Sequence, residues 1–195
     1  MPYNADIYHR HSLRLCKYDY SQAGAYFVTV CTHNKECLFG EIQDGVISLN
    51  DAGKIVHSVW DKLPISFPGI IPDEFIVMPN HCHGILLFAG AERALPRLNG
   101  LPGSSGPAEM PSSKTTRKGA ASSAPTLGDV VRTFKSKSAV NVNRFLNRSA
   151  RPLWQRNYYE HIVRSEDELN IIRDYISQNA ARWAVDDENP VKQTV

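Results

Sequence analysis

The sequence of 195 residues contains no long hydrophobic run. Its longest apolar stretch, Gly84 to Gly90, is too short to cross a bilayer. Residues 1–6 lack the apolar centre of a secretory signal, so we expect a cytoplasmic protein. The cysteines form no C-x-x-C pair, and we expect all of them to stay reduced: Cys16, Cys31, Cys37 and Cys82. These absences exclude a membrane-spanning protein and a small disulfide scaffold, and they leave a globular protein with its own core.

A large net charge is also absent, because the total is only +2. This total conceals an uneven distribution along the chain. Residues 127–164 carry eight basic and two acidic side chains, whereas residues 41–89 and 165–195 each have a net charge of −4. A basic segment of this kind is found on solvated helices as well as on nucleic-acid-binding surfaces. The charge pattern therefore indicates a candidate binding surface without identifying its ligand.

Aromatic residues are missing between Phe88 and Phe134. Of the 37 residues from Gly90 to Thr126, 22 are Gly, Ala, Ser or Pro, and such a segment buries too little apolar surface to offset its ordering entropy. We therefore predict a single domain over residues 1–195 that is interrupted by a flexible insertion at 90–126.

The remaining pattern predicts an α+β fold. Strands are expected at 25–32, 75–78 and 84–88, a hairpin around Asp44-Gly45, and a helix that starts at Asn50 or Asp51 and ends before Pro64. After the insertion, apolar residues at helical spacing predict an amphipathic helix that begins near Leu127. A final helix follows a Ser165–Glu168 capping box and has an apolar stripe that starts at Leu169. This order favours a ferredoxin-like antiparallel sheet with helices packed on it.

The sharpest local motif is His81-Cys82-His83. Alternate residues of a strand project to the same side, so both imidazoles would point at one spot and Cys82 would face the opposite way. Histidine is the commonest side-chain metal ligand, and this pair could form half of a metal site. Two histidines at a strand end without any role are the competing interpretation.

The final helix offers Tyr175 and Asn179, which are four residues apart and therefore neighbours on one helix face. The amide of Asn179 supplies a hard oxygen ligand suited to Mg²⁺ or Mn²⁺, and Tyr175 supplies a nucleophile one turn away. In the competing interpretation, Tyr175 simply borders the core and Asn179 is a surface amide.

Three blocks of the sequence resemble the single-tyrosine transposases that carry a His-hydrophobe-His (HUH) signature, and in particular the REP-associated tyrosine transposases. The blocks are residues 14–32 with Tyr18-Asp19-Tyr20 and Gly24-Ala25-Tyr26-Phe27, residues 73–85 with Met78-Pro79-Asn80-His81-Cys82-His83-Gly84-Ile85, and residues 154–164 followed by Tyr175. The resemblance covers most of the chain outside the insertion and the last ten residues. It implies the HUH endonuclease fold.

The resemblance implies that His81, His83 and Asn179 bind Mg²⁺ or Mn²⁺ and that Tyr175 is the nucleophile. Tyr158 and Tyr159 compete for the nucleophile's role, but only Tyr175 has an amide four residues later on the same helix face. Gln178 is an alternative to Asn179. The implied reaction cleaves DNA through a 5′-phosphotyrosine bond and leaves a free 3′ hydroxyl.

The implied partner is single-stranded or hairpin DNA, bound by a monomer or a homodimer. We expect phosphate contacts from basic side chains and base stacking on an aromatic one. The candidates are Arg14, Lys17, Arg132, Lys135, Lys137, Arg144, Arg148, Arg151 and Arg156, with Trp154 for stacking. Two other functions fit the same residues: a non-catalytic nucleic-acid-binding module, and a structural zinc protein that uses His81, His83 and a cysteine.

Overall fold

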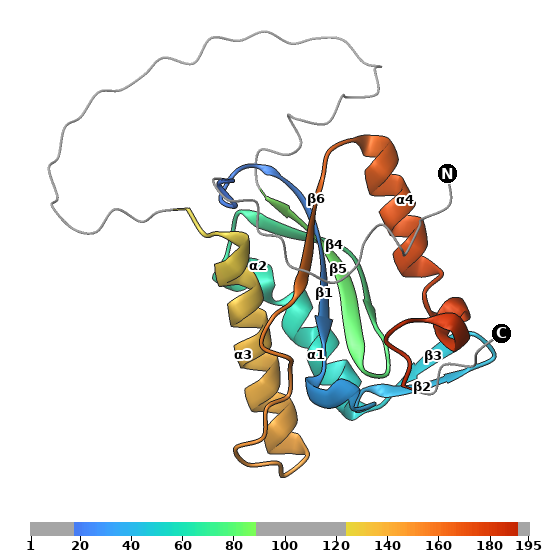
Figure 1. Ribbon diagram of the computed structural model, residues 1–195. Coiled ribbons are helices and arrows are strands. Elements are labelled where there is room, and N and C mark those ends of the chain that lie inside the picture. The colour runs from blue at the N-terminus through green and yellow to red at the C-terminus, as the bar shows by residue number, and fades with distance from the viewer. Residues whose placement is uncertain (1–17, 89–123, 191–195) are drawn as a thin grey trace, which may run out of the picture.

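The computed structural model describes residues 18–88 and 124–190 (Figure 1). Arg14, Lys17 and most of the predicted insertion at 90–126 lie outside these residues. The elements, in chain order, are β1 (Gly24–Cys31), η1 (His33–Lys35), β2 (Gly40–Gln43), β3 (Val46–Leu49), α1 (Asp51–Asp61), α2 (Leu63–Ser66), β4 (Ile70–Val77), β5 (His81–Phe88), α3 (Leu127–Phe145), β6 (Tyr159–Val163), α4 (Glu166–Ser177) and η3 (Ala180–Val185). None of the helices within the described ranges combines the length and apolarity that a membrane span requires.

The main sheet has four strands in the order β4-β5-β1-β6, and every neighbouring pair is antiparallel. The hairpin β2–β3 forms a separate two-stranded sheet. Strands β1 and β5 occupy the centre, as in a ferredoxin-like sheet. The predicted fold class, an α+β fold with an antiparallel sheet and helices packed on it, is confirmed.

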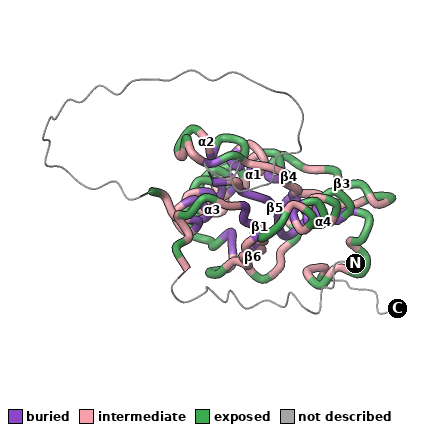
Figure 2. The backbone as a smooth tube through the Cα atoms, turned by 90° about the horizontal axis from the view of Figure 1, so that it is seen from above, coloured by how far each residue is buried: buried purple, intermediate pink, exposed green. Residues whose placement is uncertain are grey.

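Side chains of the two central strands alternate between the faces of the sheet. Val30 and Cys82 belong to a large apolar cluster that includes residues of α1 and α3. Phe27 and Ile85 belong to a smaller cluster with Leu169, Ile172 and Ile176 of α4. In Figure 2 the buried strands run between α1 and α3 on one side and α4 on the other. The sheet therefore has two faces, which we call the α1/α3 face and the α4 face.

The α1/α3 face is packed with aromatic rings. Trp60 stacks on Phe75 with centroids 4.3 Å apart and meets Phe134 edge-on at 5.3 Å. Gly84 lies directly below, because a Cβ atom there would come within 2.5 Å of Trp60 Cζ2. A side chain at position 84 would have to displace the indole, so this close approach requires glycine.

Local capping signals set most helix ends. The Asn50 side chain accepts a hydrogen bond from the Gly53 amide at the start of α1, as expected. A capping box between Thr126 and Asp129, which the sequence analysis did not identify, begins α3. At α4, Ser165 caps the helix, but Glu168 accepts from the Arg164 amide instead of closing the predicted box. The same carboxylate lies 2.8 Å from His161 Nε2 and so ties β6 to α4.

The β2–β3 hairpin turns at Asp44-Gly45, where both residues have positive φ angles of 50° and 75°. This backbone is that of a type I′ turn, for which Asp-Gly is a preferred sequence. A Cβ atom on Gly45 would lie 3.3 Å from the Ala181 backbone in η3. The hairpin thus packs beside the segment that follows α4, close to the start of β5 (Figure 1).

Candidate active site

His81 and His83 open strand β5 and project to the α4 face. The register pairs His83 with Thr29 and His81 with Cys31 of β1. Both imidazoles are almost fully buried, and their Nε2 atoms are 3.0 Å apart. Cys82, between them, points to the α1/α3 face, where its Sγ donates to the Val30 carbonyl. Strand alternation thus aims the two imidazoles at one point, as the H-x-H spacing predicts.

The outer nitrogen of each ring has its own partner. His81 Nδ1 lies 2.8 Å from Asn80 Oδ1, and His83 Nδ1 lies 2.8 Å from Thr29 Oγ1. Burial lowers the pKa of His83 to about 3, so this imidazole is neutral at physiological pH. A neutral imidazole held by its far nitrogen is the form that binds a metal ion.

Tyr175 of α4 reaches the same point from above the sheet. Its hydroxyl lies 3.4 Å from His83 Nε2, and its ring meets His83 edge-on with centroids 5.3 Å apart. Burial raises the pKa of Tyr175, and the negative charges of Asp186 and Glu188 raise it further, whereas a hydrogen bond from Asn179 acts in the opposite direction. The phenol is therefore protonated at neutral pH unless positive charge is brought close to it.

Asn179 lies two residues beyond Ser177, the end of α4, and is only 1 % exposed. Its Oδ1 atom is buried and has no hydrogen-bond partner among the described residues. A buried amide oxygen without a partner costs about 1–3 kcal/mol, so this atom is a candidate ligand. Gln178, the alternative, is exposed, and its Oε1 accepts from Arg182. The structure thus places the amide of Asn179, and not that of Gln178, in the interior beside Tyr175.

Asp186 is a member of this site that the sequence analysis missed. Within the described part of the chain, the group of possible ligands comprises His81, His83 and Asp186, whose ligand atoms all lie within 4.8 Å of one another. Its segment is anchored over the start of β5, because Lys35 contacts both the Asp187 carbonyl at 3.0 Å and the Glu188 carboxylate at 3.4 Å. The run Asp186-Asp187-Glu188 was visible in the sequence, but only the tertiary fold brings it to the histidines.

The donor set fits a divalent cation that prefers mixed nitrogen and oxygen ligands. Two imidazoles, a carboxylate and a partnerless amide oxygen could together hold such a cation without any thiolate ligand. Cys82 faces the other side of the sheet, and the converging group in the described residues contains no cysteine. The zinc alternative therefore lacks its sulfur ligand.

The other two candidate tyrosines lie on β6 or just before it. Tyr158 packs against the cluster of the α1/α3 face. Tyr159 packs against the cluster of the α4 face and meets Phe27 edge-on at 6.2 Å. Tyr175, in contrast, places its hydroxyl 3.4 Å from His83 Nε2.

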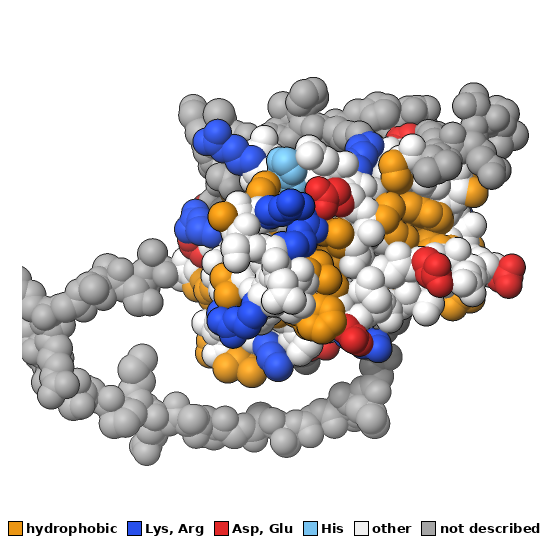
Figure 3. Space-filling view, turned by 90° about the horizontal axis from the view of Figure 1, so that it is seen from below, with side chains coloured by type: hydrophobic (Ala, Val, Ile, Leu, Met, Phe, Trp, Pro, Cys, Tyr) orange, Lys and Arg blue, Asp and Glu red, His pale blue; other side chains and the backbone are white. Residues whose placement is uncertain are grey.

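The basic side chains of α3 and the following loop lie mostly away from the histidine pair. Lys135 is turned inward and donates to the carbonyls of Gln155 and Arg156, and Arg148 donates to Glu36. The exposed cations of α3 and this loop include Arg132, Lys137, Arg144, Arg151 and Arg156, and Figure 3 shows Lys and Arg side chains gathered on the side of α3. A shallow groove of about 430 Å³ runs between α3 and residues 153–158, and Arg132, Lys135 and Arg156 line it.

The expectation that Trp154 stacks on bases is wrong in this structure. Its side chain is 6 % exposed and packs on Phe39 and Phe134. Its indole Nε1 donates to Ser138 Oγ inside the core. Trp154 therefore stabilises the α1/α3 face instead of offering a free aromatic surface.

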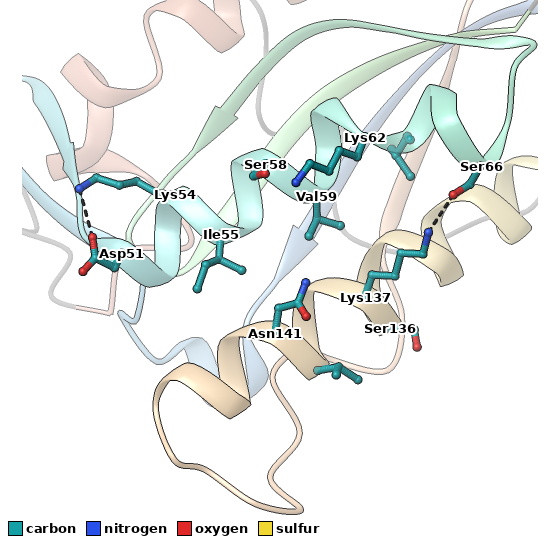
Figure 4. A pocket seen from close by; sticks show the side chains of 12 residues that line it. Asp51, Lys54, Ile55, Ser58, Val59, Lys62, Ser66, Ser136, Lys137 and Asn141 are labelled. Carbon is teal, nitrogen blue, oxygen red and sulfur yellow. Dashed lines mark hydrogen bonds and ion pairs between the residues drawn. The ribbon is translucent and has the colours of Figure 1, made fainter.

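A larger cavity of about 700 Å³ lies between α1, α2 and α3, on the face opposite the histidine pair. Figure 4 shows its apolar floor with Ile55 and Val59, and three lysines around it. Two of these are already engaged, since Lys54 contacts Asp51 and Lys137 donates to Ser66. The sheet therefore separates this cavity from the histidine pair and Tyr175.

Comparison with known proteins gives one sequence relative and a shared fold. No family model matches the chain. An uncharacterized protein of Haemophilus influenzae strain Rd is 39 % identical over 184 residues, which cover 94 % of this chain and 95 % of that protein. A solved REP-associated tyrosine transposase bound to a REP hairpin matches with a TM-score of 0.53 at 15 % identity and covers 87 % of this chain and 73 % of its own.

A transposase candidate of Deinococcus radiodurans R1 matches with a TM-score of 0.44 at 15 % identity, over 86 % of this chain and 96 % of that one. At such identities, the likeness to the REP-associated transposase concerns the fold alone.

Proposed function

The chain belongs to one family with the uncharacterized Haemophilus influenzae protein, and we propose that it is a metal-dependent single-stranded DNA endonuclease and strand transferase with Tyr175 as its nucleophile. The observation that carries this proposal is the convergence on the α4 face. A tyrosine hydroxyl lies 3.4 Å from an imidazole nitrogen that itself belongs to a cluster of three potential metal ligands. The shared fold with a tyrosine transposase supports the same class of reaction.

His81 and His83 would hold the cation, with Asn179 or Asp186 as an oxygen ligand. When bound, the cation would polarise the scissile phosphate and favour the phenolate of Tyr175. Tyr175 needs a nearby positive charge to lose its proton, because burial and the carboxylates of Asp186 and Glu188 raise its pKa. Tyr175 alone at neutral pH is a weak nucleophile.

In the proposed step, the Tyr175 oxygen attacks the scissile phosphorus and loses its proton. A bond forms between the tyrosine oxygen and the 5′ phosphate, the bond from phosphorus to the 3′ oxygen breaks, and that oxygen takes up a proton to leave as a 3′ hydroxyl. The reverse attack by a 3′ hydroxyl on the phosphotyrosine rejoins a strand. Because one phosphate ester replaces another, joining needs no nucleotide energy source.

We propose that the substrate is single-stranded DNA or a DNA hairpin, by analogy with the REP hairpin bound by the structural neighbour. The exposed cations Arg144, Arg151 and Arg156 extend from the end of α3 along the following loop. Phosphate contacts by such side chains would make binding weaken steeply with salt. Lys135 and Arg148 would act indirectly, by fixing this loop through their contacts with Gln155 and Glu36.

The test is formation of a covalent adduct. The purified full chain is incubated with Mn²⁺ and 3′-labelled hairpin oligonucleotides taken from the DNA that flanks its gene, and the products are separated on a denaturing gel. We expect a band shifted by the mass of the protein for wild type and for the control Tyr159→Phe, and a loss of at least about 10³-fold for Tyr175→Phe. An adduct that persists in Tyr175→Phe overturns the assignment of the nucleophile.

The gel also separates the proposed enzyme from a non-catalytic nucleic-acid-binding module. Such a module would retain hairpins in a native gel-shift assay and form no adduct with any of them. If the wild-type chain behaves in that way with Mn²⁺ and with Mg²⁺, the catalytic proposal fails.

A further inference from the structure

We infer that Asn80 and Thr29 are positioning residues that set the protons of the two candidate ligands, Asn80 for His81 and Thr29 for His83. The inference rests on the proposed function, because the position of the ring proton matters most when the imidazoles bind a cation. Its evidence is the hydrogen-bond pattern behind the rings, which is independent of any ligand.

The orientation of the Asn80 amide is fixed by its donors. Asn80 is 1 % exposed, and its Nδ2 lies 2.6 Å from the Glu188 carbonyl and 3.2 Å from the Lys35 carbonyl. A flipped amide would put its oxygen against these two carbonyl oxygens, where no hydrogen could bridge them. Oδ1 must therefore face His81.

An amide oxygen only accepts hydrogen bonds, so His81 Nδ1 must carry the proton across the 2.8 Å contact with Asn80 Oδ1. In the neutral ring, the lone pair is then on Nε2, the atom that faces His83 at 3.0 Å. Asn80 thus keeps the nitrogen that points into the site available as an acceptor or ligand.

Thr29 differs from Asn80 because its hydroxyl does not fix the proton of its histidine in one position. Its Oγ1 lies 2.8 Å from His83 Nδ1, and a hydroxyl can either donate or accept. When both rings are neutral and no cation is bound, the lone pair of His81 Nε2 faces a proton on His83 Nε2, so His83 Nδ1 accepts from Thr29. With both Nε2 atoms used as ligands, the proton of His83 belongs on Nδ1 and the hydroxyl turns to accept it. Thr29 can therefore stabilise both forms of His83, whereas Asn80 stabilises one form of His81.

The register explains why these two residues can do this. Thr29 is the direct cross-strand partner of His83, and Asn80 precedes His81 at the start of β5, where its own carbonyl accepts from the Thr32 amide. Both are therefore placed by the backbone of the two central strands. Partners behind metal-binding histidines typically change metal affinity by 10–100-fold when they are removed.

The test combines nitrogen NMR of the full chain at pH 8, without metal, with Mn²⁺ affinity from the EPR signal of the free ion. Long-range ¹H–¹⁵N spectra of ¹⁵N-histidine-labelled protein distinguish the two neutral tautomers. We expect the Nδ1–H form for His81 and the Nε2–H form for His83. With Zn²⁺ added as a diamagnetic probe, His83 should shift to the Nδ1–H form.

Matched substitutions separate positioning from folding. Thr29→Val keeps the shape of the side chain but removes the hydroxyl, and we expect Mn²⁺ affinity to fall by about tenfold or more, whereas Thr29→Ser restores it to within about twofold. Asn80→Asp keeps an acceptor for His81 and loses the two donated hydrogen bonds, so it should keep the Nδ1–H form of His81. Asn80→Ala should lose that form.

The outcomes are distinct for the two proposals. An Nε2–H form of His81 in wild type, or equal Mn²⁺ affinity in Thr29→Val and Thr29→Ser, overturns the positioning roles and leaves the proposed function standing. Wild-type protein that shows the expected tautomers but does not bind Mn²⁺ overturns the proposed function, while the tautomer assignment holds. Because the spectra of wild type and of the Thr29 pair suffice, misfolding of an Asn80 variant does not remove the test.

Discussion

The two faces of the central sheet are built from the same strands and differ in what they bury. On β5, Cys82 and Leu86 enter an apolar cluster on the α1/α3 face, whereas His81 and His83 enter the α4 face. The α4 face also buries the amide of Asn179 and partly buries the ring of Tyr175, beside a short apolar patch. One face therefore looks like an ordinary core, and the other holds polar groups at a cost in stability.

This difference supports the proposed active site on the α4 face. Burying imidazoles and a partnerless amide oxygen costs free energy that an apolar replacement would not. Proteins usually depart from consistent core packing where function requires it. The 700 Å³ cavity, in contrast, lies on the α1/α3 face, away from these polar groups.

The largest expected effect on stability comes from the α1/α3 face. Trp60→Ala removes an indole that is 1 % exposed and packed between Phe75 and Phe134. We expect the free energy of unfolding to fall by about 3–5 kcal/mol, measured by urea denaturation. Tyr175→Phe, which removes only a hydroxyl on the α4 face, should cost less than about 1 kcal/mol. A cost well below about 3 kcal/mol for Trp60→Ala would contradict the role of this ring in the core.

A pH-dependent effect should come from the α4 face. His83 has an ordinary pKa of about 6.5 when unfolded and about 3 in the folded protein, because burial disfavours its charged form. Below pH 6.5 the unfolded chain binds a proton that the folded chain does not, so stability falls as the pH drops.

The contribution of His83 is about 1.4 kcal/mol per pH unit between roughly pH 6 and pH 3. Urea denaturation at a series of pH values, with a chelator present, should therefore show that the free energy of unfolding falls more steeply with decreasing pH for wild type than for His83→Gln. Parallel curves for wild type and His83→Gln would show that His83 does not stay neutral in the folded protein.

The smallest expected effect comes from the residue between the two histidines. Cys82→Ala removes a buried sulfur from the α1/α3 face and should cost about 1 kcal/mol in urea denaturation. Mn²⁺ affinity should change by less than about twofold, because Cys82 points away from the site. A tenfold loss of affinity would instead make Cys82 part of the site, as the zinc alternative requires.

Features that depend on residues close together in the chain were predicted well from the sequence. The alternation at His81-Cys82-His83, the cap at Asn50 and the Asp44-Gly45 turn depend on neighbours in the chain, and the structure shows each of them. Strand β6 was missed, because Tyr159–Val163 is an edge strand whose burial on both sides is only partial and gives weak alternation.

The remaining features depend on tertiary packing. Asp186 approaches the histidines only because Lys35 and Asn80 hold the segment after η3. The arginines around Trp154 suggest a surface position. In the structure, however, an isolated β-bridge pairs Trp154 with Thr32, and the indole is buried in the core. No pattern of spacing or composition contains either contact.

The most direct test of the account identifies the residue that becomes attached to DNA. The adduct formed with Mn²⁺ and a cleavable hairpin is digested with nuclease and protease, and the tyrosine that carries the nucleotide is located by mass spectrometry. The account predicts Tyr175, whose hydroxyl lies 3.4 Å from His83 Nε2 on the α4 face. Modification of Tyr158, which packs on the α1/α3 face, would contradict it.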